Sequence, residues 1–514
     1  MRASPYQDDR RVGAIFIAAF LLCLITAMRL LLLERIPGLN GDEALAGLRA
    51  HQVMLGQGDL HGLVPYTGGL YEYGLAAFLW LFGTSVFGLR FFPAMLGALT
   101  VWIVYRDLGA RGHGAAAFWG ALVLGSSPLM VCYNRLAVDN YPLLLSVPVW
   151  CLILLERSQG RPALLVPCGF LLGLLVWCHF LGLAVMIPFL ILLPLIRKGG
   201  IPAGHKIYAV SFLAMALPAV LRVMEIAKSR DLLMPEAFST MPLRLLSTLP
   251  EDLMDLLFMA YKTLDGTFVF LRFTGEVLVD PIPIVPALGL LVLVLGLATG
   301  HSGITRFALP LFLALLAAIR VLAPYTSIRY FAVANLCLLF LLVRWLAEVA
   351  DSGRWRRRAV TFTLSVVALY QLGLVGINYF YAFHRTGGIP VLFALDVHGR
   401  RQENSVHMME NRVLYDRLCQ EAGPAGSRRR LLADPNLAYA MAFYDLGRAC
   451  LDVVPLLQGE SPGPGDRLLL YRMTQWRDDQ SLLASLRRSG LFVKEIRELS
   501  DLKYRVLEVT SARQ

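Results

Sequence analysis

The sequence has few charged residues and none of the short motifs that usually mark a metal, redox or nucleotide site. Only 17% of its residues are Asp, Glu, Lys or Arg. It contains no CxxC, no HExxH, no His-rich ligand spacing and no Gly-rich loop between a strand and a helix. These absences argue against a zinc hydrolase, a dithiol redox protein and a P-loop enzyme. An internal repeat of the transporter type is also missing.

Long apolar runs dominate the sequence instead. Its hydrophobic residues make up 57% of the chain, and many runs reach about 20 residues, the length needed to cross a bilayer as a helix. We therefore predict an all-α polytopic membrane protein with about eleven transmembrane helices. The predicted spans are 12–33, 89–106, 114–132, 139–155, 163–179, 181–196, 207–222, 282–299, 306–322, 331–349 and 359–379. The short stretch 70–82 is expected to lie in the membrane interface or to re-enter it.

The basic residues predict the orientation in the membrane. In a membrane protein, basic residues mostly set the topology, so the net charge of +11 does not indicate a nucleic-acid partner, and none is expected. Basic residues gather in the short loops on one side, which is expected to be cytoplasmic: Arg2, Arg10, Arg11, Arg106, Arg111, Arg157, Arg161, Arg197, Lys198, Lys206 and Arg354 to Arg358. Loops 34–88 and 223–281 then face outward. Arg outnumbers Lys, as in GC-rich genomes, which favours a bacterial inner membrane.

A change in composition divides the chain into two parts. Residues 1–382 form the predicted membrane module, and 383–514 a soluble, extracytoplasmic α/β domain with denser charge. Its short apolar runs at 430–433, 467–473, 491–496 and 504–509 predict strands, and 480–489 has a helical pattern. Cys419 and Cys450 are the only cysteines of this domain and could pair in an oxidising compartment, which the sequence leaves open.

The most informative local feature is the acidic pair Asp42–Glu43, which follows the first span. Carboxylates near a bilayer are costly, by roughly 2.5 kcal/mol or more at its centre, so they need a reason to be there. One reading is structural: Asn40 or Asp42 caps a helix over 43–55, and acids favour its N-terminal dipole. The other reading is catalysis by a carboxylate base.

Further charged and aromatic residues occur at the same predicted outer rim. Arg90 begins the second span, Arg135 and Asp139 lie between the third and fourth, and Arg329 and Tyr330 open the tenth. Arg135 and Asp139 could form a helical ion pair, and the other arginines could reach lipid headgroups. Taken together, they predict a site of both charge signs. Arginines suit a lipid-anchored phosphate and a carboxylate suits proton removal, a combination that fits glycosyl transfer from a polyprenyl-phosphate sugar.

At these residues the sequence resembles the GT-C membrane glycosyltransferases, in particular the branch of protein O-mannosyltransferases and lipid A aminoarabinose transferases. The resemblance covers residues 12–160 and returns at the Arg-Tyr pair 329–330. It rests on Gly41-Asp42-Glu43 before a juxtamembrane helix, on the stretch ending Trp80-Leu-Phe-Gly83, and on the run from Arg90 to Gly97. It also includes Arg135 and Asp139. The middle of the chain and the C-terminal domain match by hydropathy alone.

The resemblance implies roles for individual residues. Asp42 corresponds to the base that activates the acceptor, and Glu43 to its orienting partner. Arg329 and Tyr330 would bind the donor phosphate, while Arg135 and Asp139 frame the site. Relatives carry a phosphate-binding lysine, and some a metal ligand, where this chain has Pro65 to Tyr73 without lysine. Glu72 either substitutes there or is an exposed interfacial residue. A divalent metal is the one cofactor left open.

The sequence therefore predicts an inverting glycosyltransferase that uses a polyprenyl-phosphate-linked monosaccharide. The acceptor is expected to be a lipid, a glycan or a protein on the outer face of the membrane.

Residues 242–262 have apolar residues at helical spacing, which predicts a helix that covers the lipid-facing site or packs on neighbouring spans. The alternative functions are a secondary transporter, or a non-catalytic membrane subunit of a glycan assembly or export system.

Overall fold

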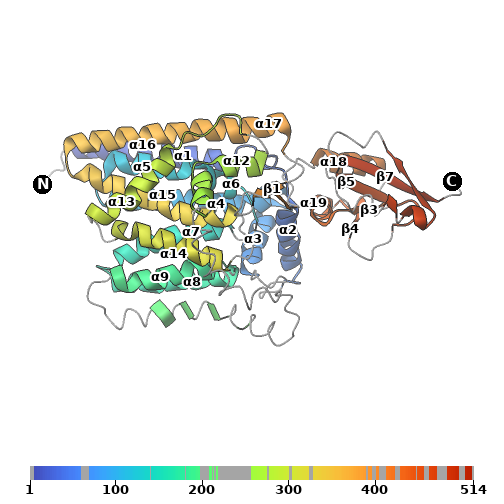
Figure 1. Ribbon diagram of the computed structural model, residues 1–514, viewed down its shortest axis with the longest axis horizontal. Helices are drawn as coiled ribbons and strands as arrows, with labels where there is room; N and C mark the ends of the chain where they lie inside the picture. Colours follow the sequence, from blue (N-terminus) through green and yellow to red (C-terminus); the bar gives the residue numbers. More distant parts are fainter. Residues whose placement is uncertain are drawn as a thin grey trace.

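The computed structural model describes most of the chain, with gaps. The described residues are 5–58, 69–138, 141–179, 181–196, 208–210, 212–213, 216–217, 221, 256–274, 277–299, 304–322, 328–388, 392–395, 401–404, 412–422, 429–446, 448–456, 462–471, 483–484, 486–496 and 504–511. Two parts lie end to end along the long axis of the molecule (Figure 1): a bundle of roughly parallel helices and a smaller domain that carries a β-sheet.

The bundle is built from the apolar runs of the sequence. Its helices are α1 (Pro5–Leu30), α4 (Val86–Ala110), α5 (Gly114–Ser126), α6 (Pro128–Tyr133), α7 (Tyr141–Arg157), η1 (Pro162–Leu164), α8 (Leu165–Cys178), α9 (Gly182–Ile196), α12 (Thr267–Thr274), α13 (Ile284–Thr299), η2 (Thr305–Phe307), α14 (Ala308–Leu322), α15 (Ile328–Asp351), α16 (Arg354–Val375), η3 (Gly376–Tyr381) and α17 (Ala382–Thr386). A helix covers every predicted span except 207–222, most of which lies outside the described residues.

Three of the described helical stretches are long and apolar enough to cross a membrane on their own. They are Val86–Ala110, Tyr330–Asp351 and Arg354–Thr386; shorter apolar helices accompany them. The number of crossings and the side of the membrane that each loop faces remain predictions. The stretch Tyr330–Asp351 is the central helix of the bundle, because 94% of its apolar window is buried.

Two helices outside the parallel bundle lie at the end that meets the smaller domain. They are α2 (Gly41–Met54) and α3 (Leu70–Phe82). The predicted interfacial stretch 70–82 is thus helical, and its Phe78 and Phe82 pack on Phe91 of α4, with ring centroids 5.8 and 4.5 Å apart. Of the predicted helix over 242–262, residues 256–262 are described and helical, and the others lie outside the described residues.

The C-terminal domain carries a mixed five-stranded sheet with the strand order β4-β3-β5-β7-β6. Its strands are β3 (Arg429–Ala433), β4 (Leu451–Pro455), β5 (Arg467–Tyr471), β6 (Leu491–Glu495) and β7 (Tyr504–Ser511). Strand β3 pairs in parallel with β4 and β5, and β7 pairs antiparallel with β5 and β6. Helices α18 (Arg412–Ala422) and α19 (Pro435–Asp445) pack beside it, and β1 (Leu392–Leu395) with β2 (Arg401–Asn404) forms a separate antiparallel pair.

The two faces of this sheet belong to different cores. Successive residues of a strand point to opposite faces, and on β3 the side chains of Leu431 and Ala433 join the large core of the molecule. Leu432, between them, joins a small separate core with Leu468 and Leu507. The large core includes the bundle, α2 and α19. One face of the sheet is therefore continuous with the apolar interior of the membrane module.

Candidate functional site

The loop between α1 and α2 is held by a buried arginine. The last carbonyls of a helix have no intrahelical donor, and Arg135 supplies donors at the end of α1. Its Nη1 donates to the carbonyls of Met28 and Arg29 at 3.0 and 2.8 Å. Its Nη2 donates to the carbonyls of Leu31 and Ile36 at 2.7 and 2.8 Å. Arg135 thus fixes both the end of α1 and the turn that follows it.

Arg90 of α4 holds the next part of the same loop. Its Nη1 donates to the carbonyls of Leu33 and Pro37 at 2.8 and 2.7 Å, and its Nη2 to the carbonyl of Gly38 at 3.1 Å. The remaining donors, Nε–H and the second Nη2–H, bind the two oxygens of Glu43 at 2.7 and 2.6 Å. A guanidinium has five N–H donors, so these contacts use all of them.

Glu43 completes this arrangement from α2. Its side chain and that of Arg90 are both fully buried, and Oε1 also accepts a hydrogen bond from the backbone N–H of Ala137 at 3.0 Å. Bidentate Arg–carboxylate pairs are geometrically demanding. Glu43 therefore ties α2 to α4 and to the segment that follows α6.

Asp42 lies at the start of α2, where this buried framework ends. The helix is capped by Asn40, whose Oδ1 accepts a hydrogen bond from the N–H of Glu43 at 2.9 Å. The structural reading of the sequence allowed Asn40 or Asp42 as the cap, and the structure has Asn40. Asp42 is partly exposed, whereas Asn40 and Glu43 on either side of it are buried. The backbone at Asp42 is thus fixed by the start of α2, and Asn40 rather than Asp42 is the cap.

The C-terminal domain packs on α2 through its helix α19. In Figure 1, α19 lies directly against α2. At Gly47 an added Cβ would stand 2.5 Å from Cε2 of Phe443 and 3.1 Å from Cδ2 of Leu89. Gly41, Ala44, Gly47 and Ala50 are all buried. Because Gly47 has no side chain, Phe443 of α19 and Leu89 of α4 both reach the backbone of α2.

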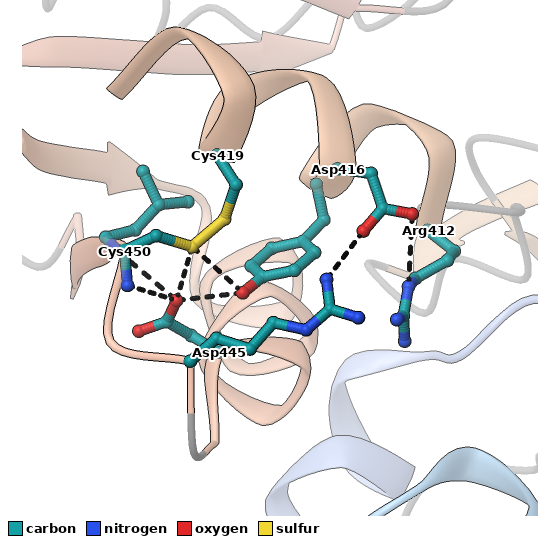
Figure 2. Close-up of a disulfide and its surroundings, with 8 residues drawn as sticks. Arg412, Asp416, Cys419, Asp445 and Cys450 are labelled. Atoms are coloured by element: carbon teal, nitrogen blue, oxygen red, sulfur yellow. Dashed lines mark hydrogen bonds and ion pairs between the residues drawn. A yellow bond between two sulfur atoms is a disulfide. The ribbon is translucent and has the colours of Figure 1, made fainter. Parts of the chain in front are cut away.

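A disulfide and an aspartate connect α18, the end of α19 and the start of β4. Cys419 of α18 is bonded to Cys450, the pairing that the sequence left open. Figure 2 shows Asp445, at the end of α19, directed at this bridge: Oδ1 accepts from Tyr415 Oη at 2.9 Å and from the N–H of Cys450 at 3.0 Å. Burial raises the pKa of Tyr415 above its usual range, so this hydroxyl stays protonated and donates.

We expect Gly47→Leu to separate α19 from α2. Overpacking costs about 1–3 kcal/mol, and each 1.4 kcal/mol is a factor of ten in an equilibrium. Amide exchange in α19 should therefore quicken roughly tenfold or more, as measured by hydrogen–deuterium exchange of the full chain. The matched control is Gly109→Leu, at a helical glycine with open space around its Cβ position. Equal exchange in both variants would show that the close approach does not hold the domain.

Of the other predicted site residues, the structure describes the side chains of Tyr330 and Glu72 but not those of Arg329 and Asp139. Tyr330 is in the first turn of α15 and is partly buried, while the side chain of Arg329 and all of Asp139 lie outside the described residues. Residues 134–138 are not helical, so Arg135 is on a turn rather than on a helix. Glu72 is 6% exposed, not an exposed interfacial residue, and its Oε1 lies 3.8 Å from Nη1 of Arg49.

A divalent metal has no evident ligand set beside Asp42 within the described residues. The neighbouring carboxylate, Glu43, is engaged by Arg90 and by the N–H of Ala137. In the described part of the chain, three side chains of types that bind metals lie close together: Cys419, Asp445 and Cys450. Both of its sulfurs are used by the disulfide.

Sequence reasoning missed two parts of this site. The first is the use of Arg90 and Arg135 to bind the carbonyls of the α1–α2 loop. The available signal was the end of a helix followed by a loop with Pro37, whose carbonyls need hydrogen-bond donors. The second is the packing of α19 on α2. The many Gly and Ala residues of α2, among them Gly47, were present in the sequence and could have indicated a close helix contact.

Comparison with known proteins supports the predicted fold. Residues 69–224 match the family model described as dolichyl-phosphate-mannose-protein mannosyltransferase. The structure is similar to ArnT from Cupriavidus metallidurans solved with undecaprenyl phosphate, with a TM-score of 0.60, 13% identity, and coverage of 97% of this chain and 98% of that one. The apo form of ArnT gives a TM-score of 0.59 at 13% identity, covering 98% of this chain and 99% of that one.

A weaker similarity is found to the Archaeoglobus fulgidus oligosaccharyltransferase, with a TM-score of 0.45, 15% identity, and coverage of 91% of this chain and 61% of that one. No curated protein matches the sequence. The predicted resemblance to GT-C glycosyltransferases is confirmed, and the likeness to ArnT at 13% identity establishes the fold.

Proposed function

We propose that this protein is an inverting glycosyltransferase that moves a monosaccharide from a polyprenyl-phosphate donor to a lipid, glycan or protein acceptor. The observation that carries the proposal is the position of Asp42. Its carboxylate is partly exposed at the end of a loop that two buried arginines and Glu43 hold in place. A full-length fold similar to that of ArnT, solved with undecaprenyl phosphate, supports the choice of donor.

The reaction is a single displacement. Asp42 takes the proton of the acceptor hydroxyl or amine, whose heteroatom attacks the anomeric carbon of the sugar from the face opposite the phosphate. The bond between that carbon and the phosphate oxygen breaks, and polyprenyl phosphate leaves with the electron pair. Inversion follows because one displacement occurs. The proton on Asp42 then passes to solvent, to which this side chain is partly open.

The remaining predicted residues divide into two roles in this proposal. Arg329 and Tyr330 at the start of α15 bind the donor phosphate, with Asp139 and Glu72 framing the site. Arg90 and Arg135 were predicted to bind substrate; because Arg90 spends all five N–H donors within the protein, we assign it, with Arg135, to positioning the loop that leads into α2, the helix of Asp42. The distribution of arginines supports an outward-facing site in a bacterial inner membrane.

Arg329→Ala is expected to weaken use of the donor far more than use of the acceptor. A charge-assisted contact to phosphate is worth about 1.5–3 kcal/mol, so the apparent donor KM should rise about tenfold or more. Steady-state transfer from a short-chain polyprenyl-phosphate sugar measures this. The control is Arg306→Ala in η2, whose neighbour Thr305 donates to Glu348 near the opposite end of α15 from Arg329. An unchanged donor KM in folded Arg329→Ala would remove this residue from the donor site.

The proposal as a whole is tested by incubating the purified protein with polyprenyl-phosphate sugars and candidate lipid, glycan or protein acceptors, and measuring release of polyprenyl phosphate. Release that depends on Asp42 supports glycosyl transfer. A secondary transporter or a non-catalytic membrane subunit would release none, with or without Asp42.

A further inference from the structure

At the end of the bundle opposite the C-terminal domain, α4, α7 and α8 line a cavity of about 790 Å³ that is open to the outside of the bundle. Helix α4 contacts α2 through Arg90 and Glu43 and reaches the cavity at Trp102 and Arg106. Arg106 is about 24 Å further along the helix at 1.5 Å per residue. The cavity is thus separate from the site around Asp42. Its volume is that of pockets which hold small molecules.

One side of the cavity is apolar. Its walls include the side chains of Trp102, Ile103, Trp150, Leu154 and Leu171. The indole of Trp150 is held in place because its Nε1 donates to Oγ1 of Thr100 at 3.1 Å.

These walls continue onto the outer surface of the bundle. Leu99, one helical turn before Trp102 and Ile103, is 44% exposed, and Phe170, next to Leu171, is 47% exposed. An apolar chain lying on this surface can therefore reach the cavity without crossing a polar barrier.

The other side of the cavity is strongly basic. It is lined by Arg106, Arg111, Arg157 and Arg161, against two carboxylates, Asp107 and Glu156. The lining thus has an excess of two positive charges. Positive charge at the edge of an apolar cavity favours an anion whose remainder is apolar.

The two carboxylates are already neutralised by a fixed network. Asp107 is bound by Nε of Arg157 at 2.6 Å and by Nε of Arg111 at 3.2 Å. Glu156 receives Nη1 and Nη2 of Arg111, both at 2.9 Å, and Nη2 of Arg344 from α15 at 3.0 Å. Arg111 thus gives three of its five N–H donors to these carboxylates, and the network anchors this arginine and Arg157.

The remaining arginines keep donors available for a ligand. Arg106 stacks over the ring of Trp102, with its Cζ 5.9 Å from the centroid. Within the described residues neither Arg106 nor Arg161 has an ion-pair partner, and Arg157 uses only its Nε for Asp107. These three guanidiniums present N–H groups at the mouth of an apolar cavity, the arrangement that binds phosphate oxygens.

We propose that this cavity binds an anionic phospholipid from the membrane leaflet at that end of the bundle. The phosphate headgroup is held by Arg106, Arg157 and Arg161, and an acyl chain lies along Trp102, Trp150 and the exposed surface of α4 and α8. Tryptophan and arginine together match the depth at which headgroup and acyl chain meet. The site is independent of the sugar-transfer site, and no step of the proposed reaction passes through it.

The test compares lipid binding by purified full-length protein, using native mass spectrometry with added phosphatidylglycerol or phosphatidylcholine. Basic residues near an anionic membrane surface strengthen binding about fivefold each, so the double variant Arg106→Gln, Arg161→Gln should lose about tenfold or more in the preference for phosphatidylglycerol. The control is Arg354→Gln, Arg357→Gln, which removes the same charge from exposed residues at the same end of the bundle.

Three results would overturn the proposal: no preference for phosphatidylglycerol in the wild type, an equal loss in the control variant, or displacement of the lipid by millimolar inorganic phosphate. The last would assign the basic side of the cavity to a free anion instead. Unchanged melting temperatures of the two double variants in the same detergent are required, and expected, because neither removes a residue of the ion-pair network.

Discussion

Asp42→Asn is expected to lower sugar transfer by at least about a hundredfold while leaving the fold unchanged. General-base catalysis contributes about 10² to 10⁴ in rate, and an amide cannot take the proton of the acceptor. The helix should not be affected, because Asn40 rather than Asp42 is its N-cap. The measurement is turnover with a polyprenyl-phosphate sugar, beside the melting temperature of the same sample in the same detergent.

A matched control for this substitution is Asp280→Asn, the same change at an exposed carboxylate in the other predicted outer loop. It should leave turnover within about twofold, since most surface substitutions have small effects. Transfer by Asp42→Asn at a rate near that of Asp280→Asn would sink the assignment of the base, even if the protein proved to be a glycosyltransferase.

The second large effect is expected at Glu43, and it is an effect on stability. Removing one partner of a buried ion pair leaves an uncompensated charge and costs about 3–5 kcal/mol. In Glu43→Ala that charge is on Arg90, whose side chain is fully buried. The variant should therefore show a clearly lower melting temperature than wild type, along with loss of transfer. Asp42→Asn should differ from it by retaining the melting temperature.

A double variant separates the ion pair from the rest of the site. Replacing both members of a buried pair by apolar residues of similar volume is often neutral, so Glu43→Leu with Arg90→Met should recover part of the lost stability. Recovery should be incomplete because the carbonyls of Leu33, Pro37 and Gly38 then lose their donor. A wild-type melting temperature for Glu43→Ala would contradict the stabilising role of the pair.

The elements that depend on local pattern could be predicted from the sequence. The strands at 430–433, 491–496 and 504–509 follow from short apolar runs between polar turns, and the structure has β3, β6 and β7 there. The helix that follows Asp42 was expected over 43–55 and occupies Gly41–Met54. In each case the signal lies within a few residues, because backbone propensity, capping and periodicity act over one or two turns.

The contacts that depend on the folded chain could not be predicted in the same way. The sequence gives Arg90 and Glu43 the same weight as any other charged residue at a predicted rim, and nothing in their spacing pairs them. Their interaction follows from the packing of α2 on α4, which brings together residues far apart along the chain. For the same reason Arg90 was assigned to substrate, when its donors are spent on the loop before α2.

The contact between Gly47 and Phe443 has a consequence for how the protein is made. The first residue is synthesised among the earliest membrane segments and the second only after all the helices of the bundle. Until α19 emerges from the ribosome, α2 can pack on α3 and bind Arg90 of α4 but lacks its contact with Phe443. If translocation delays the C-terminal domain, the helix that carries Asp42 waits with the side that faces α19 uncovered. Completion of the last domain would then act as the step that switches a nascent membrane bundle into its mature form.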